Sequence, residues 1–485
     1  MNSDLLTEEV DLPLQMDEST QKGLQRFAKE AIQQNASYVA CTLPIDLIDP
    51  LSCLQTGWQA QTFNYYWEKP SEHFAIAAGG ELLSLSAEGS GRFGSINRQY
   101  KKISNDTAVF KGAPHAYAGL MFLGGFSFFD RMNDSRWNSF EPASLTIPKW
   151  LVFRDDKYAF VTTFTDVNRF NESTTLFDHL ISSFHRVEQI IETARSVSFR
   201  DTTFKAGNGT LRSHNSLPAY QSWIPSVKQA KQFIRTNEFD KIVLARRFSV
   251  PKKNDQQAVD MLHNLRMHYP GCSCFLVHQP KGNSFLGTTP EYLGSFHNNL
   301  LLTEALAGSM ERGGTQEEDT MLENKLRFSP KNKEEHQFVV RDIRQRLQSL
   351  TESIYYDHQP RIKKLSNVQH LNTPIRAHLK DDTDILSVVE QLHPTPAVGG
   401  YPRKEAMNYI RGLEDFERGW YAGPVGWMTP SGSGEFAVAI RSGLLSKDKA
   451  HFFAGCGIVA DSDPKEEWEE TNLKLSPMLS ALNYD

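Results

Sequence analysis

The chain has 485 residues, of which 39% are hydrophobic and 23% charged, an ordinary composition for a globular protein with a large core. The formal net charge of -6 is small for this length, so it gives no reason to expect a nucleic acid or an anionic membrane as a partner. The five cysteines have no spacing typical of a zinc site, and we expect free, mostly buried thiols.

The N-terminal segment predicts neither secretion nor membrane insertion. It begins MNSDLLTEEV, which is acidic and lacks the basic and apolar regions of a signal peptide. No run of apolar residues approaches the roughly 18 that a membrane span needs. We therefore expect a cytoplasmic protein whose residues 1–20 are frayed.

The first half of the chain reads as strands with a few helices. A helix is expected over 21–34 and a strand over 36–43, and antiparallel strands with Gly-rich turns over 57–165 include a hairpin that turns at Asp155 and Asp156. The run from Gly89 to Gly94 matches GxGxxG, but no βαβ unit surrounds it, so we interpret it as a turn. Apolar residues at helical spacing predict a long helix over 176–194.

The polar stretch 201–222 is the best candidate for a linker. We nevertheless predict a single domain over 21–485, in which 21–215 completes the sheets of a catalytic half at 216–485. In the second half, helices are expected at 226–236 and from 330 to about 350, and strands at 241–246, 273–278, 362–370, 425–428, 435–445 and 450–457.

The last helix carries two charged residues on one face. Asp463 is suited to be its N-cap and Pro464 to be its first residue. Glu470 and Lys474 are four residues apart, so they lie side by side. Spacing alone allows a solvated ion pair or a part of a functional site.

Three further charged residues stand in unusual places. Glu335 lies beside the apolar stripe of its helix, where it needs a salt bridge or a bound cation. Lys241 opens an apolar strand, either as a charge that protects the strand edge or as a partly buried base. Glu291 follows a strand in a loop, either as an exposed or helix-capping acid or as a catalytic group.

Nine segments of the chain together resemble the chorismate-utilising enzymes, and within them the isochorismate synthases. They are KIVLAR (241–246), TTPEYL (288–293), TEALAGSMERG (303–313), KNKEEH (331–336), VQHL (368–371), HPTPAVGGYP (393–402), YAGPVG (421–426), EFAVAIRS (435–442) and GCGIVADSDPKEEWEETNLK (455–474). The N-terminal half resembles the family only through short runs such as GGFSF (124–128).

This resemblance implies an α/β (α+β) fold, with two sheets in a sandwich flanked by helices around a deep polar site. It implies an isomerase that uses Mg²⁺ to convert chorismate reversibly to isochorismate. Water adds at ring carbon 2, and the hydroxyl at carbon 4 leaves. It also implies a monomer that needs no glutaminase partner, nucleic acid or membrane.

Roles follow from the resemblance by motif position. Lys241 resembles the base that activates water, and Glu291 resembles the acid that protonates the departing hydroxyl, a role that requires burial to keep it protonated. Glu335 and Glu470 resemble the Mg²⁺ ligands. In this arrangement Glu470 and Lys474 meet through substrate and metal rather than directly. The residues expected at the substrate are Leu306, Ala307, Gly308, His370, Ala397, Arg441, Gly455 and Lys474.

Two positions favour water over other nucleophiles. Anthranilate synthases, which use ammonia, usually carry glutamine at the position of Lys241. Aminodeoxychorismate synthases use a lysine at the position of Ala307. Salicylate synthases share both signatures with this chain and then eliminate pyruvate, so that step stays open. An inactive chorismate-binding relative, and a place in menaquinone or siderophore biosynthesis, also stay open.

Overall fold

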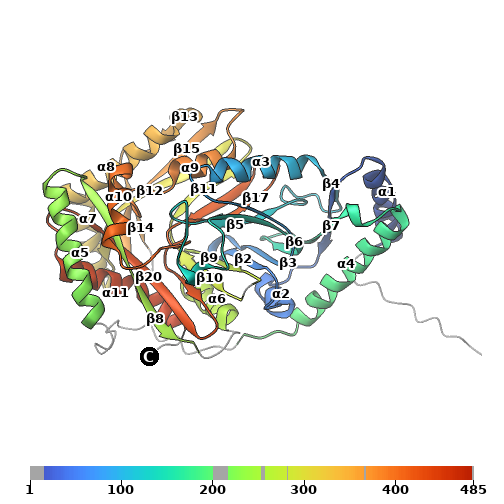
Figure 1. The fold of residues 1–485 in the computed structure, drawn as a ribbon, viewed down its shortest axis with the longest axis horizontal. Coiled ribbons are helices and arrows are strands. Elements are labelled where there is room, and N and C mark those ends of the chain that lie inside the picture. The colour runs from blue at the N-terminus through green and yellow to red at the C-terminus, as the bar shows by residue number, and fades with distance from the viewer. Residues whose placement is uncertain (1–15, 200–216, 253–256, 281, 365–367, 483–485) are drawn as a thin grey trace, which may run out of the picture.

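The computed structural model describes residues 16–199, 217–252, 257–280, 282–364 and 368–482. The described residues contain both helices and strands in each half of the chain, which confirms the mixed fold class (Figure 1). The α-helices are α1 (Glu18–Gln33), α2 (Pro50–Gly57), α3 (Arg92–Asn105), α4 (Ser173–Ala194), α5 (Leu217–Arg235), α6 (Gln257–His268), α7 (Gln316–Phe328), α8 (Pro330–Leu347), α9 (Ile385–Leu392), α10 (Arg403–Leu413) and α11 (Pro464–Ala481).

The strands of the first half are β1 (Tyr38–Ile45), β2 (Asn64–Lys69), β3 (Phe74–Ala87), β4 (Thr107–Lys111), β5 (Phe122–Phe126), β6 (Ala143–Arg154) and β7 (Ala159–Asp166). Those of the second half are β8 (Lys241–Pro251), β9 (Ser273–His278), β10 (Ser284–Thr289), β11 (Tyr292–His297), β12 (Leu300–Glu311), β13 (Thr351–Tyr356), β14 (Arg361–Lys364), β15 (Val368–Leu379), β16 (Gly400–Tyr401), β17 (Pro424–Met428), β18 (Gly434–Val438), β19 (Ser442–Leu445) and β20 (Lys449–Ile458). All of them join one hydrogen-bonded network.

The network divides into arms at the long strand β6. One edge of β6 pairs with β3 along its length, whereas the other edge pairs with β5 near its start and with β7 near its end. One arm runs β3-β2-β9-β10-β19-β20-β8-β16. The other runs β5-β17-β18-β11-β12-β15 and ends in β13 and β14. The two predicted sheets are therefore arms of one continuous sheet.

The two long arms face each other across a shared apolar core. Tyr65 on β2 donates a hydrogen bond of 2.9 Å to the carbonyl of Gly426 on β17. The rings of Phe74 on β3 and Trp427 on β17 stack with centroids 5.5 Å apart. Strands of the first half thus pair and pack with strands of the second, while the single-domain organisation stays a prediction.

Two groups of helices lie at opposite ends of the molecule. Figure 1 shows α1 and α4 at one end and α5, α7, α8, α10 and α11 at the other. At the second end α8 packs on β12, α10 on β8 and α11 on β20. Among the described residues, no helix is long and apolar enough to cross a membrane. All five cysteines are free and buried, as predicted.

Two boundaries differ from the sequence prediction. Helix α1 begins at Glu18 because the Asp17 carboxylate accepts the backbone N–H of Thr20, so residues 18–20 are helical rather than frayed. Residues 1–15, also predicted as frayed, lie outside the described residues. Most of the predicted linker lies outside them too. Its last residues, from Leu217, form the start of α5, so this part of the linker prediction was wrong.

The GxGxxG run does form a turn, with Gly89 at φ +80°. The turn leads into α3 at Arg92, a helix that the sequence did not predict. The following strand β4 pairs in parallel with β1 rather than with β3, so no βαβ nucleotide unit surrounds the glycines. The hairpin turn at Asp155 and Asp156 is confirmed between β6 and β7.

Candidate active site

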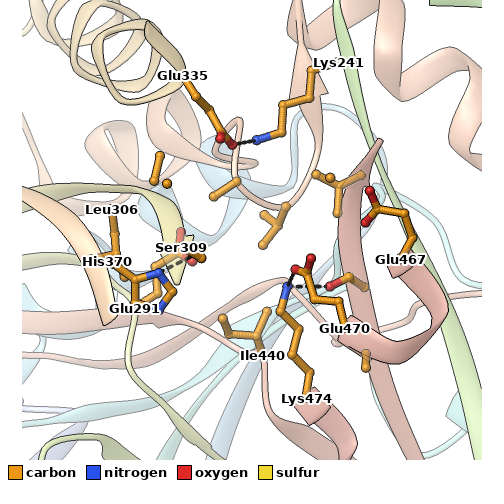
Figure 2. A pocket seen from close by; sticks show the side chains of 18 of the residues that line it. Lys241, Glu291, Leu306, Ser309, Glu335, His370, Ile440, Glu467, Glu470 and Lys474 are labelled. Carbon is orange, nitrogen blue, oxygen red and sulfur yellow. Dashed lines mark hydrogen bonds and ion pairs between the residues drawn. The ribbon is translucent and has the colours of Figure 1, made fainter. Parts of the chain in front are cut away.

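All the predicted site residues lie together. They line one pocket of about 380 Å³ between α8, α11 and the strands β8, β12 and β20 (Figure 2). The residues are Lys241, Glu291, Leu306, Ala307, Gly308, Glu335, His370, Ala397, Arg441, Gly455, Glu470 and Lys474. The pocket is thus assembled from side chains that are distant in sequence, on both arms of the sheet and on two helices.

Lys241 and Glu335 form an ion pair across the pocket. The Lys241 Nζ lies 2.6 Å from the Glu335 Oε1. Glycine at position 457 on the neighbouring strand leaves room for the lysine, because a Cβ there would lie 2.6 Å from the Lys241 Cε. Glu335 therefore has the salt bridge that its place on α8 called for, with a lysine as partner.

Glu470 and Lys474 also contact each other directly, so the expectation that only substrate and metal connect them was wrong. Their Oε1 and Nζ atoms are 2.7 Å apart, and Lys474 also donates to the carbonyl of Gly455 at 2.9 Å. Residues four apart on a helix need no bridging group to meet. Burial opposes the charge on Lys474, but the neighbouring Glu470 outweighs it and raises the pKa of Lys474.

Glu291 is buried in the loop between β10 and β11, with 8% of its surface exposed. Its backbone is held by Val438 N–H and by the Thr289 hydroxyl, and its carboxyl accepts a hydrogen bond of 3.1 Å from the Thr395 hydroxyl. Burial raises the pKa of Glu291 to about 7, although the Thr395 bond opposes this shift. Glu291 is thus neither an exposed acid nor a helix cap, and its raised pKa brings the gain and loss of its proton close to neutral pH.

Arg441 interrupts what the sequence predicted as one strand over 435–445. Its φ of +50° ends β18 at Val438 and lets β19 begin at Ser442. Gly287 on the paired strand accommodates this turn, because a Cβ there would lie 2.7 Å from the Arg441 carbonyl oxygen. Arg441 is buried and lines the pocket. Burial lowers its pKa, but an arginine side chain keeps its charge in proteins.

His370 is a neutral member of the pocket. Its Nδ1 lies 2.8 Å from the Ser309 hydroxyl. Burial, with the nearby charges of Arg441 and Lys474, lowers the pKa of His370 to about 3. Ser309 lies on β12 and His370 on the paired strand β15. The register between these two strands shifts at Gly308, whose φ of +75° suits glycine. The bulge therefore marks the part of β12 that lines the pocket.

Sequence reasoning missed several residues of the site. Glu467 precedes Glu470 by three residues and lines the same pocket, which helical spacing could have indicated. Burial and the Glu470 charge raise the pKa of Glu467 against the opposing Ser462 bond. The contact of Thr395 with Glu291 had no local signal, because the two residues are far apart in sequence.

A buried ion pair holds two walls of the pocket together. Arg418 Nη2 and Glu414 Oε1 are 2.5 Å apart, and both side chains are almost fully buried. Arg418 also donates to the carbonyls of Val398 and Val243, each at 2.8 Å, and Glu414 accepts the backbone N–H of Ala245 at 2.7 Å. The pair thus ties the loop that carries Ala397 to strand β8.

The carboxylates of the pocket are of the kind that Mg²⁺ prefers. Glu335 projects from α8, and Glu467 and Glu470 project from α11. Within the described residues, no three ligating side chains cluster tightly enough to hold an ion by themselves. Sites that bind Mg²⁺ commonly supply one or two carboxylates and leave the remaining positions to substrate oxygens and water. The donor set therefore fits Mg²⁺ bound together with an anionic substrate.

Comparison with known proteins identifies the family of this chain. A salicylate biosynthesis isochorismate synthase of Pseudomonas aeruginosa is 37% identical over 92% of this chain and 90% of its own length. The isochorismate synthase MenF of Bacillus subtilis is 32% identical over 94% and 95%. The structure of MenF from Escherichia coli matches with a TM-score of 0.72, at 24% identity, over 96% of this chain and 100% of its own.

The family match extends through the N-terminal half, where the sequence showed only short similar runs. The model of the family described as chorismate binding enzyme matches residues 23–483. The chain therefore belongs to the chorismate-binding enzymes.

Proposed function

We propose that this protein is an isochorismate synthase, an isomerase that interconverts chorismate and isochorismate with Mg²⁺. The observation that carries the proposal is the presence in one pocket of Lys241 and of the buried Glu291, whose pKa burial raises to about 7. Addition of water to one ring carbon and loss of hydroxide from another need a base and an acid at different places. The names of the relatives from P. aeruginosa and B. subtilis support this activity.

The cationic side chains of the pocket complement the negative charge of the substrate. Chorismate carries two carboxylates, and Arg441 and Lys474 offer charge-assisted hydrogen bonds to such groups. Mg²⁺, held by Glu335 and Glu470, would supply further positive charge for a substrate carboxylate and favour a neutral amine nearby. The Gly455 carbonyl and the Glu470 carboxylate fix Lys474 in place, which suits a residue that only binds.

The chemical step requires one proton to be taken and another to be given. Lys241, as a neutral amine, takes a proton from the water that forms the new bond at carbon 2. Glu291 gives its proton to the hydroxyl leaving carbon 4, so water is consumed and released in equal amounts. His370, neutral at physiological pH, orients groups through hydrogen bonds and adds no charge.

The test is a product assay with the purified full chain, chorismate and Mg²⁺, without ammonia. Formation of isochorismate that reverses when isochorismate is supplied supports the proposal. Salicylate together with pyruvate would show that elimination follows, as in salicylate synthases. Binding of chorismate without any turnover would identify an inactive relative and overturn the proposal.

We place the enzyme in the cytoplasm as a monomer that works without a glutaminase. The five free, buried thiols support a reducing compartment. Sedimentation or light scattering of the purified chain measures the oligomeric state directly.

A further inference from the structure

A second pocket lies on the outer side of α8, away from the residues assigned above. It has a volume of about 550 Å³ and lies between the end of α7, α8 and the segment that joins β13 to β14. Small-ligand sites commonly measure about 300–1,000 Å³. The hollow is therefore large enough for a small organic molecule.

The pocket concentrates positive charge on a chain whose net charge is -6. Lys333, Arg341 and Arg344 line it from α8, and none of the three has an ion-pair partner in the described parts of the chain. By contrast, Arg327 at its edge is paired with Glu323 at 2.7 Å, and the acidic Asp357 is paired with Arg361. The net charge of the lining is thus clearly positive.

Two of these cations, Lys333 and Arg344, form cation–π contacts with aromatic rings in place of ion pairs with carboxylates. The Arg344 guanidinium lies 4.8 Å from the centre of the Tyr356 ring, and the Lys333 ammonium lies 5.6 Å from that of Phe328. Phe328 is 68% exposed, which is unusual for a large apolar side chain. Like charges three residues apart on a helix, as at 341 and 344, repel each other and cost stability. An anion bound between them removes that cost.

The second pocket and the catalytic pocket share helix α8. His336 is buried and lines the second pocket, with its Nε2 2.8 Å from the Thr373 hydroxyl. The preceding residue, Glu335, faces the catalytic pocket and Lys241. The two pockets therefore lie back to back on one helix.

We propose that this second pocket binds a small organic anion carrying phosphate or several carboxylates, held by Lys333, Arg341 and Arg344. Arginine forks match the oxygens of both groups, and the rings of Phe328 and Tyr356 form apolar walls for the rest of the ligand. The size of the hollow favours a small molecule over an acidic peptide. The proposal does not depend on the isochorismate synthase assignment, because binding is measured without turnover.

Calorimetric titration of the full chain with pyrophosphate, and separately with tricarballylate, tests the proposal and distinguishes phosphate from carboxylate ligands. We expect saturable binding of at least one of them, weakened about 10-fold or more in Arg341→Gln/Arg344→Gln, because charge-assisted hydrogen bonds are lost. The matched control is Arg98→Gln/Lys102→Gln, which removes two exposed cations from α3 and should leave the affinity unchanged.

Three outcomes would overturn the proposal. They are the absence of saturable binding, an affinity equal in wild type and Arg341→Gln/Arg344→Gln, and binding of a glutamate octapeptide in place of both small anions. An equal affinity would place the anion in the catalytic pocket. If the glutamine variant melts early, Arg341→Lys/Arg344→Lys keeps the charges but removes the forked geometry. That variant should still weaken binding.

Discussion

Two lysine–glutamate pairs face the same pocket, and they are built in different ways. Lys241 and Glu335 come from β8 and α8, and only the fold brings them to 2.6 Å. Glu470 and Lys474 stand four residues apart on α11 and meet at 2.7 Å by helix geometry. Lys474 has a second anchor in the Gly455 carbonyl. Within the described residues, the side chain of Lys241 donates a hydrogen bond to Glu335 alone.

The difference in anchoring matches the proposed difference in role. A base must lose its proton and turn toward water. The Glu335 carboxylate favours the charged form of Lys241, so the lysine must leave this contact to act as a base, and one contact is easier to leave than two. A clamp must stay charged and in place, which suits a lysine held from two sides. The predictions below test whether the pair between β8 and α8 serves chemistry and the pair within α11 serves binding.

The largest effect is expected from replacing Lys241. Lys241→Arg keeps the charge beside Glu335 but cannot supply a neutral base, since arginine stays protonated. We expect turnover of chorismate to fall by about 10³-fold or more in both Lys241→Arg and Lys241→Ala, in the range of general-base catalysis. The measurement is the initial rate of isochorismate formation at saturating chorismate and Mg²⁺.

Thermal melting of the same variants separates chemistry from folding. Because Lys241 is the first residue of β8 and lines the pocket, both variants should melt close to wild type. Full activity of a folded Lys241→Arg protein would exclude Lys241 as the base.

The second effect concerns Glu291, the acid of the proposed reaction. Glu291→Gln fills the same volume without a proton to give, so we expect a loss of about 10²-fold or more in turnover. In the wild type, activity should fall as the pH rises through about 7, where Glu291 loses its proton. A pH profile of the rate without such a limb, or an active glutamine variant, would contradict the assignment.

Stability gives an independent check on Glu291. Its folded pKa of about 7 exceeds the ordinary value of 4.5. The stability from the protonated form is therefore fully present below 4.5 and is lost as the pH rises through 7. Between about pH 5.5 and about pH 8, wild type should lose about 2 kcal/mol of unfolding free energy relative to Glu291→Gln. Denaturant titrations at both pH values measure this difference.

The sequence predicted features that depend on neighbouring residues, and it did not predict features that depend on contacts between distant segments. The N-cap of α11 at Asp463, the spacing of Glu470 and Lys474 on that helix, and the apolar run that opens β8 are local features, and the sequence showed each of them. Burial of Glu291 depends on Thr395 and on packing from distant segments, which no local pattern shows. The pocket residues could be gathered before the structure only through the resemblance to a family.

Two other features of the fold could not be predicted from the sequence, for physical reasons. The break at Arg441 follows from a positive φ in a residue that rarely adopts it. The union of two expected sheets follows from β6, which is long enough to pair with two strands on one edge. Strand length and alternation do not reveal how many neighbours a strand has.

The third prediction compares the two glutamates as ligands of Mg²⁺. Glu335→Ala and Glu470→Ala each remove one carboxylate, so we expect the Mg²⁺ concentration for half-maximal activity to rise about 10-fold or more in each. Glu335→Ala also removes the counter-charge of Lys241, and it should lower the maximal rate as well. A metal requirement that is unchanged in titration would show that the residue is not a ligand.

The smallest effect is expected from Lys474. Lys474→Gln loses the charge that faces the substrate but can still donate to the Gly455 carbonyl, so the local backbone should keep its position. We expect the KM for chorismate to rise about 10-fold, as for one lost charge-assisted hydrogen bond, with kcat within about threefold of wild type. Lys474→Arg, which keeps the charge, should recover part of the affinity. If Lys474→Gln instead lowers kcat as strongly as Lys241→Arg, the two pairs do not divide chemistry from binding, and both lysines act on the transition state.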